Sequence, residues 1–341
     1  MAQRPRPVAR EPYVFGSLAR IELVAPPARA RAVLDDVERT LDVMHRDWHP
    51  WEPSALTALN AALAEGRPHR TPPTLLALIA AARPHVAASD GRFDPAVGGL
   101  VALWGFHTSD WPITSPEPDA AAIERWRAAR PRLDDVHVAG ELVSSGNRAV
   151  QLDFNAIAEG MATRTIVATL AAHEVRAALI ALGGDVHALG ARGARGWNVA
   201  VRDPDRGALA TVVLADGESL YASGGYGRYR EGAAGRLPHL LDPRTGHPAR
   251  GLVASAVLVR DPVLADAAAT ALVVAGPREW HEVAARMGIA CALVVDEAGV
   301  VHATRAFAAR AAWSTTRTIK LVGSAAPCDA TPSDALPHRP E

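Results

Sequence analysis

The sequence predicts an α+β fold, and three observations support this prediction. Segments typical of strands and of helices are mixed along the 341 residues, without the regular strand–helix–strand alternation of a doubly wound sheet. Hydrophobic residues make up 49% of the chain and charged residues 21%, so a sizeable core can form and extensive disorder is excluded. The length fits one large unit or two domains, and no internal repeat divides it.

One strand and four helices are expected in the first 130 residues. Residues 15–24 alternate in part between apolar and polar side chains, as a strand does. Ser54 is predicted to cap the second helix, and the prolines that follow Thr71 suit the first positions of the third. The four helices are expected at residues 28–46, from Ser54 to Ala64, from Thr71 to Gly91, and at 119–130.

The rest of the chain is predicted to mix short strands with longer helices. Strands are expected at 149–154, 176–182, 197–202, 209–215, 237–241, 252–260, 290–295 and 299–303, and helices at 156–172, 264–275 and 277–287. Together the elements define one domain over residues 13–312. A Pro/Arg-rich arm before it (1–12) and a tail after it (313–341) are predicted to be disordered.

Charge, hydropathy and cysteine content exclude several classes of protein. The formal net charge is −1, so no basic excess exists to bind a nucleic-acid backbone. No apolar run approaches the roughly 18–20 residues of a membrane span. The N-terminus has neither an apolar signal segment nor a lipid-accepting cysteine, so a cytoplasmic location is expected unless the start codon is misassigned. Cys291 is expected to be a buried thiol and Cys328 to lie in the polar tail, with no disulfide framework.

Familiar catalytic motifs are absent from the sequence. It has no P-loop, zinc-protease or nucleophile-elbow motif, and Gly183-Gly184-Asp185 lacks the rest of a dinucleotide-binding fingerprint. Four polar clusters in apolar surroundings remain as candidate parts of a site. The first, at residues 93–106, combines glycines with aromatic residues, so a planar ring can approach the backbone; a packed turn is the alternative.

The second and third clusters suit an anionic substrate. Asp153 ends a strand just before a helix whose free N–H groups can bind an anion, unless Asp153 or Asn155 only caps that helix. The third cluster comprises residues 223–225 and 239–248. In it His239 can exchange protons near neutral pH and an arginine can match a phosphate; a hydrogen-bonded Asp-Pro turn is the alternative.

The fourth cluster suits a hard cation. Asp266 and Thr270 are four residues apart and therefore share one helix face, where a carboxylate and a hydroxyl can hold Mg²⁺. The alternative is that Asp266 favours the helix dipole and Thr270 bonds back to the helix backbone.

In this order, the four clusters resemble the ApbE family of FAD:protein FMN transferases, over almost the whole predicted domain. The resemblance is carried above all by F-D-P-A-V-G-G-L-V-A-L-W-G-F and H-L-L-D-P-R-T-G-H-P. It implies a single α+β domain with mixed sheets, packed helices and a cleft that binds FAD with Mg²⁺. It also implies transfer of FMN from FAD to a Thr or Ser hydroxyl of a partner flavoprotein, with release of AMP.

The resemblance also implies roles for individual residues. Carried over to this chain, the family's metal site falls on Asp266, Thr270 and the backbone carbonyl of Ala156, and its general base falls on His239. The contacts to the flavin nucleotide fall on Trp104, Gly105, Phe106, Asp153, Glu159 and the Leu240 backbone.

The chain departs from the family pattern at three places. Glu159 stands where the family often has Lys, and Phe15-Gly16-Ser17 stands where it usually has Met-Gly-Thr. The family's flavin-stacking Tyr falls at Pro50, so Trp48 or Trp51 is expected to take over the stacking. The same residues also suit a hydrolase that splits FAD into FMN and AMP, and the departures leave a non-catalytic FAD-binding protein as a further alternative.

Overall fold

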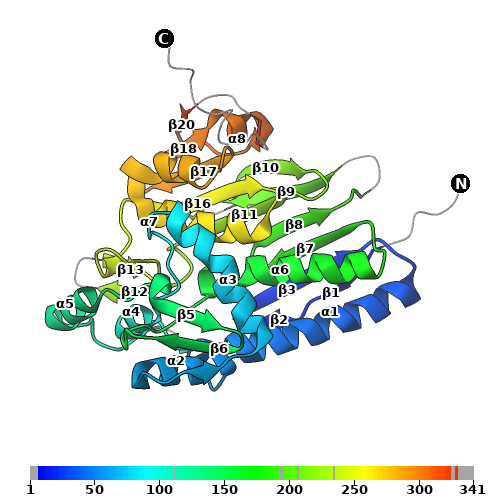
Figure 1. The fold of residues 1–341 in the computed structure, drawn as a ribbon. Coiled ribbons are helices and arrows are strands. Elements are labelled where there is room, and N and C mark those ends of the chain that lie inside the picture. The colour runs from blue at the N-terminus through cyan, green and yellow to red at the C-terminus, as the bar shows by residue number, and fades with distance from the viewer. Residues whose placement is uncertain are drawn as a thin grey trace, which may run out of the picture.

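A ten-stranded sheet is the framework of the described structure, with helices packed on one face and a smaller sheet on the other (Figure 1). The computed structural model describes residues 7–110, 112–192, 196–205, 207–232, 235–323 and 327–328. In order across the large sheet the strands are β1 (Val8–Arg10), β3 (Ser17–Leu23), β7 (Ala178–Leu182), β8 (Asp185–Leu189), β11 (Ser219–Gly224), β16 (Leu252–Val259), β17 (Ala292–Asp296), β18 (Val301–Thr304) and β20 (Ile319–Val322), and β2 (Tyr13–Val14) pairs with β3. The β18–β20 pair is parallel, and the other neighbours are antiparallel.

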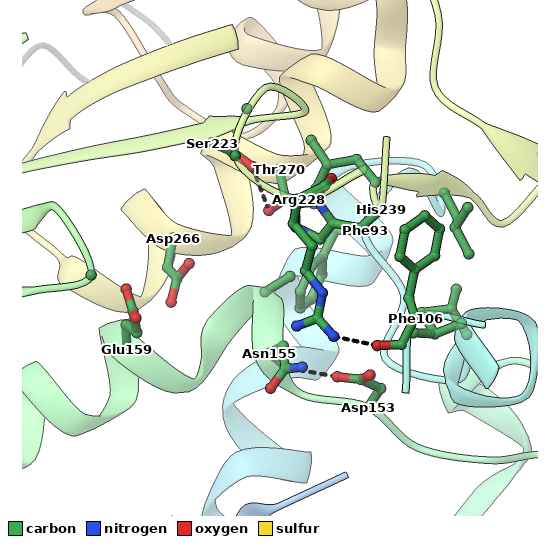
Figure 2. Close-up of a pocket in the computed structure, with 18 of the residues that line it drawn as sticks. Phe93, Phe106, Asp153, Asn155, Glu159, Ser223, Arg228, His239, Asp266 and Thr270 are labelled. Atoms are coloured by element: carbon green, nitrogen blue, oxygen red, sulfur yellow. Dashed lines mark hydrogen bonds between the residues drawn. The ribbon is translucent and has the colours of Figure 1, made fainter. Parts of the chain in front are cut away.

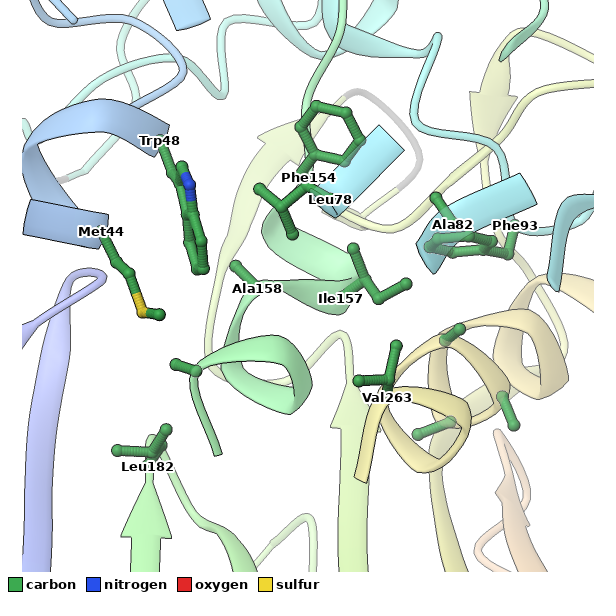
Figure 3. Packing of buried hydrophobic residues seen from close by; sticks show 14 of the residues in the cluster. Met44, Trp48, Leu78, Ala82, Phe93, Phe154, Ile157, Ala158, Leu182 and Val263 are labelled. Atoms are coloured by element: carbon green, nitrogen blue, oxygen red, sulfur yellow. The ribbon is translucent and has the colours of Figure 1, made fainter. Parts of the chain in front are cut away.

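Three long helices cover one face of this sheet, and their buried residues form the main core. They are α1 (Pro27–Trp48), α6 (Asn155–Ala172) and α7 (Pro262–Arg286). Along α1 the buried side chains recur at three- and four-residue spacing, which turns one apolar stripe toward the sheet. Ile157 of α6, Val263 of α7 and Leu182 of β7 belong to this core (Figure 3).

The helices α6 and α7 approach each other closely at Gly160. A Cβ atom at this position would lie 2.5 Å from the backbone oxygen of Pro262 and 3.0 Å from the Cβ of Asp266. A larger residue would therefore push the two helices apart. The α7 backbone leaves the helical conformation at Gly276 (φ 72°), which precedes Pro277, so the break expected between the helices at 264–275 and 277–287 is confirmed within α7.

The remaining elements complete the second sheet and build the outer wall of the site. The opposite face of the large sheet packs against β9 (Trp197–Arg202), β10 (Ala208–Leu214) and β19 (Ala311–Trp313). Further strands are β4 (His69–Arg70), β5 (Val136–Ala139), β6 (Leu142–Ser145), β12 (Tyr229–Gly232), β13 (Gly235–Pro238), β14 (Leu241–Asp242) and β15 (His247–Pro248). Further helices are α2 (Ala55–Glu65), α3 (Pro73–Ala88), α4 (Gly98–Leu103), α5 (Ala120–Ala129), the 3₁₀ turn η1 (Leu133–Asp135) and α8 (Arg305–Arg310).

The predicted α+β class is confirmed, and local signals placed most helices well. Ser54 caps α2 through a capping box with Thr57, and Asp119 caps α5. The strands β5 and β6 were not predicted, because their few residues carry little periodicity. None of the helices in the described ranges is both long enough and apolar enough to cross a bilayer.

The two ends of the chain are more ordered than the sequence predicts. β1 lies in the expected arm and β20 in the expected tail, because each strand gains hydrogen bonds at an edge of the large sheet. Residues 1–6, 324–326 and 329–341 of those segments lie outside the described residues. The cysteine prediction was wrong: Cys291 and Cys328 form a disulfide bond, with their Cα atoms 5.0 Å apart.

Candidate active site

Two adjoining cavities lie beside the N-terminus of α6. The larger, of about 550 Å³, is lined by residues from all four clusters of the sequence, including Phe93, Asp153, His239 and Asp266 (Figure 2). The second, of about 410 Å³, is lined mainly by the segment between α1 and α2 and by the loop that follows Phe106. The two cavities share several lining residues, namely Phe15, Gly16, Asn155, Gly227 and Arg228.

A group of three buried carboxylates, called here the carboxylate cluster, forms one end of the larger cavity. Glu159 comes from α6, Asp185 from the start of β8 and Asp266 from α7. Glu159 hydrogen-bonds to Asp185 and accepts from the Ser17 hydroxyl at 3.3 Å. Asp266 accepts from the Gly160 N–H at 2.8 Å. Figure 2 shows the side chains of Glu159 and Asp266 turned toward each other.

The electrostatics of the carboxylate cluster favour a cation. Burial raises the pKa of Glu159, and it raises the pKa of Asp185 and of Asp266 well above the usual range of aspartate. Repulsion between the neighbouring carboxylates raises the pKa of both aspartates further. Within the described part of the chain, none of the three forms an ion pair with a basic side chain. Carboxyl groups with such raised pKa values retain protons, as the hydrogen bond between Glu159 and Asp185 requires, and a cation that displaced these protons would meet three carboxylates.

The predicted metal donors lie at this end of the cavity. Asp266, Thr270 and Ala156 all line it, and the Thr270 hydroxyl is 3.4 Å from the hydroxyl of Ser223. Carboxylate, hydroxyl and carbonyl oxygens are the donors that Mg²⁺ prefers, so the donor set fits this ion. The described residues contain no ready group of three His, Cys, Asp or Glu metal ligands, so a metal here depends on the hydroxyl and the carbonyl as well.

His239 faces the same cavity in a form that can accept a proton. Its Nδ1 lies 2.9 Å from the backbone oxygen of Arg228. Because a carbonyl oxygen only accepts, Nδ1 carries the hydrogen and Nε2 keeps its lone pair. Burial lowers the pKa of His239 to about 4, so the ring is neutral at pH 7.

Arg228 and Asp153 connect the two cavities. Arg228 donates to the backbone oxygens of Phe106 and Thr108, the second bond being 2.9 Å long. Asp153 accepts from the N–H of Asn155 at 2.9 Å, and its second oxygen lies 2.9 Å from Nε2 of His107. Both carboxylate oxygens of Asp153 are therefore already engaged within the protein.

The structure brings most of the predicted site residues together. The larger cavity is lined by Phe106, Asp153, Ala156, Glu159, His239, Leu240, Asp266 and Thr270. Trp104 and Gly105 do not belong to the described lining of either cavity. Trp104 is buried behind Phe106 and donates from Nε1 to the Gly246 oxygen at 2.9 Å. Gly105 adopts a φ of 77°, which lets the chain turn between these two aromatic residues.

Sequence reasoning missed three residues of this site. Asp185 was set aside because Gly183-Gly184-Asp185 does not complete a dinucleotide fingerprint, although it is an acidic residue directly after a glycine pair. His107 follows the W-G-F motif immediately, and that position was its only signal. Arg228 carried no signal of its own, since it stands in a glycine- and arginine-rich segment.

The comparison with known families decides the classification. The family model described as "ApbE family" matches residues 15–293. The chain belongs to the ApbE family. Two proteins named FAD:protein FMN transferase illustrate the relationship. The Rhodobacter capsulatus protein is 42% identical over 300 residues, and the Klebsiella pneumoniae (strain 342) protein is 28% identical over 290.

The coverage differs between these ApbE relatives. The match to the Rhodobacter protein covers 87% of this chain and 57% of that protein, so this chain spans little more than half of its length. The match to the Klebsiella protein covers 83% of both chains.

Solved ApbE structures share the fold. The Pseudomonas stutzeri flavinyl transferase ApbE in its apo form superposes with a TM-score of 0.80 at 29% identity, covering 92% of this chain and all of that one. The ApbE protein of Thermotoga maritima gives a TM-score of 0.81 at 25% identity, covering 89% of this chain and 99% of that one. The predicted family and the predicted ApbE-like fold are thus confirmed.

Proposed function

We propose that this chain is a FAD:protein FMN transferase, which moves FMN from FAD to a Thr or Ser hydroxyl of a partner flavoprotein and releases AMP. The observation that carries the proposal is the pairing of a neutral His239 with the carboxylate cluster in one cavity. The names of the relatives support the same activity, since they are called FAD:protein FMN transferases.

The chemistry needs a base and a way to accommodate the charge of a diphosphate. The free Nε2 of His239 accepts the proton of the acceptor hydroxyl, whose oxygen attacks the FMN-side phosphorus. The bond between this phosphorus and the bridging oxygen breaks, and AMP leaves with the electron pair. Such base catalysis accelerates a reaction by about 10²–10⁴-fold. Ala156 lies in the first turn of α6 and lines the cavity, so its backbone N–H can bind a diphosphate oxygen.

Asp266, Thr270 and the carbonyl of Ala156 are the residues that would hold Mg²⁺. When bound, this ion neutralises diphosphate charge and stabilises the departing AMP. Asp185 and Glu159 are further acids near Asp266, and both would add negative charge toward a cation that displaces their protons.

The second cavity suits the isoalloxazine ring of FAD, because aromatic side chains line much of its wall. Of the two tryptophans expected to replace the family's Tyr, Trp51 fits the stacking role better. Trp48 is only 4% exposed and stacks on Phe15, with 5.8 Å between ring centroids and 14° between planes. Trp51 is half-buried and lines the cavity.

The test is mass spectrometry of a candidate acceptor flavoprotein incubated with this chain, FAD and Mg²⁺. Transfer predicts a mass gain of FMN minus water on the acceptor, and no gain when Mg²⁺ is omitted. The His239→Ala variant serves as the matched control, and we expect little or no gain with it. Release of AMP and free FMN without labelling of the acceptor would overturn the transferase proposal in favour of FAD hydrolysis. FAD that stays bound and intact would indicate a non-catalytic flavin-binding protein.

A further inference from the structure

His107 lies between the two cavities without lining either of them in the described structure. Its side chain is 13% exposed, and its Nε2 lies 2.9 Å from Oδ2 of Asp153. Since a carboxylate accepts, Nε2–H donates and the bond fixes the orientation of the imidazole ring. The ring therefore has a defined plane, set by a residue of the larger cavity.

The imidazole of His107 in turn supports Trp51. The two rings are stacked, with centroids 5.6 Å apart and an angle of 26° between planes. The Arg228 guanidinium also lies over the Trp51 ring, 5.3 Å from its centroid. Arg228 is anchored by the backbone oxygens of Phe106 and Thr108, the residues on either side of His107. One short loop thus holds the indole through two contacts.

Trp51 needs this support because its own segment is irregular. It lies in the connection between α1 and α2, where no ladder of backbone hydrogen bonds fixes the chain. Trp51 also makes a T-shaped contact with His49, with 4.5 Å between ring centroids, but His49 belongs to the same connection. A large side chain in such a segment loses rotamer freedom on binding unless other groups hold it beforehand.

We propose that His107 is a positioning residue: anchored by Asp153, it fixes the plane of Trp51, which presents a stacking surface for the isoalloxazine ring of FAD in the second cavity. The inference rests on the proposed function, because it takes FAD as the ligand. The contacts from Asp153 through His107 to Trp51 connect the two cavities, because Asp153 lines the larger cavity and Trp51 lines the second. Preorganising one large side chain is worth roughly 2- to 12-fold in affinity.

The experiment is a double-mutant cycle on the full-length chain, read out by FAD affinity and by the fluorescence of bound flavin. An indole stacked on a flavin quenches flavin fluorescence, so this signal reports the contact itself and not merely folding. The variants are His107→Ala, Trp51→Ala and the double variant, with His137→Ala, an exposed histidine on β5, as the matched control. His107→Phe is added because it keeps a flat packing partner for Trp51 but lacks the bond to Asp153.

We expect His107→Ala to weaken FAD binding about three- to tenfold and to restore part of the flavin fluorescence. His107→Phe should give an intermediate result and His137→Ala none. In the Trp51→Ala background, removal of His107 should change neither signal, because the residue through which it acts is gone. If the effect of His107→Ala were the same in both backgrounds, or if bound flavin stayed fully quenched without His107, the inference would be overturned.

Failure of the proposed function gives a different result. A wild-type chain that binds no FAD would refute the function and this inference together. A wild-type chain that binds FAD but labels no acceptor would refute the transfer reaction alone, and the cycle would still report on His107.

Discussion

The two ends of the site are built on opposite electrostatic principles. At the carboxylate cluster, three elements distant in sequence bring acidic groups together in a buried place, and no basic side chain of the described residues pairs with them. Around Trp51, imidazole rings and the Arg228 guanidinium pack against the indole. The first end offers oxygen donors to the proposed cation, whereas the second offers aromatic side chains to the proposed flavin ring. Substitutions at the first end should therefore affect turnover, and those at the second should affect affinity.

The largest effect is expected from Asp266→Ala. Loss of this carboxylate should lower Mg²⁺-dependent AMP release by about 10³-fold, because several kcal/mol of charge stabilisation disappear. FAD affinity should change less than about fivefold, since flavin and adenosine contacts remain. AMP release measured against Mg²⁺ concentration, together with flavin fluorescence titration, checks both statements. Glu282→Ala, an exposed acid on the same helix, is the control. Near-normal turnover of Asp266→Ala would reject the metal assignment.

His239→Ala should have the next largest effect, a loss of about 10²–10³-fold in transfer rate with unchanged FAD affinity. The pH dependence gives a sharper check. The base is active when deprotonated, and burial lowers the pKa of His239 to about 4. The rate should therefore rise with pH through about 4, and His239 should impose no further change between pH 5 and 8. Single-turnover rates across this range test the point. A rise centred near pH 6.5 would show that the histidine is not held neutral by burial.

Gly160→Ala should have a moderate effect, because it disturbs the packing of α6 against α7 and with it the position of Asp266 in the carboxylate cluster. The added methyl would press on Pro262 and Asp266, and overpacking of this kind costs about 1–3 kcal/mol of unfolding free energy. Because Asp266 would shift, the Mg²⁺ concentration needed for half-maximal rate should rise several-fold. Gly146→Ala is the matched control, as nothing lies within 4 Å of the new atom there. Thermal unfolding and Mg²⁺ titration of both variants decide whether the tight helix contact positions the acid.

Some residues of the site could be predicted from the sequence because their neighbours in the chain define their positions, whereas others could not. The segments around Asp153, His239 and Asp266 are each defined by neighbours in the sequence, such as a helix start or a tight turn, and all three line the larger cavity. Asp185 could not be assigned in this way. Its position follows from the antiparallel register of β7 and β8, in which Leu182 opposes Asp185, and from the bond that its carboxylate accepts from Ala222.

Contacts between segments that are distant in the sequence could not be predicted either, because they too depend on how the whole chain folds. His107 and Asp153 are 46 residues apart in the sequence and meet only in the folded chain. Nothing in the composition of either segment encodes this pairing, since a histidine after W-G-F is compatible with an exposed loop. The disulfide illustrates the same limit, because an apolar run around one cysteine and a polar run around the other suggest different environments.

The smallest effect on activity is expected from the bond between Cys291, directly before β17, and Cys328, neither of which lines either cavity. In the chain-entropy model, a link across roughly 40 residues stabilises a fold by about 3–4 kcal/mol. Reduction or Cys328→Ser should therefore lower the melting temperature by about 5–15 °C, and it should leave AMP release within about twofold because the bond lies away from both cavities. Thiol alkylation with mass spectrometry should find no free cysteine before reduction. Disulfides persist in oxidising compartments, so an oxidised chain isolated from its own cells would contradict the cytoplasmic location expected from the N-terminus. Two free thiols in the purified chain would instead contradict the bond.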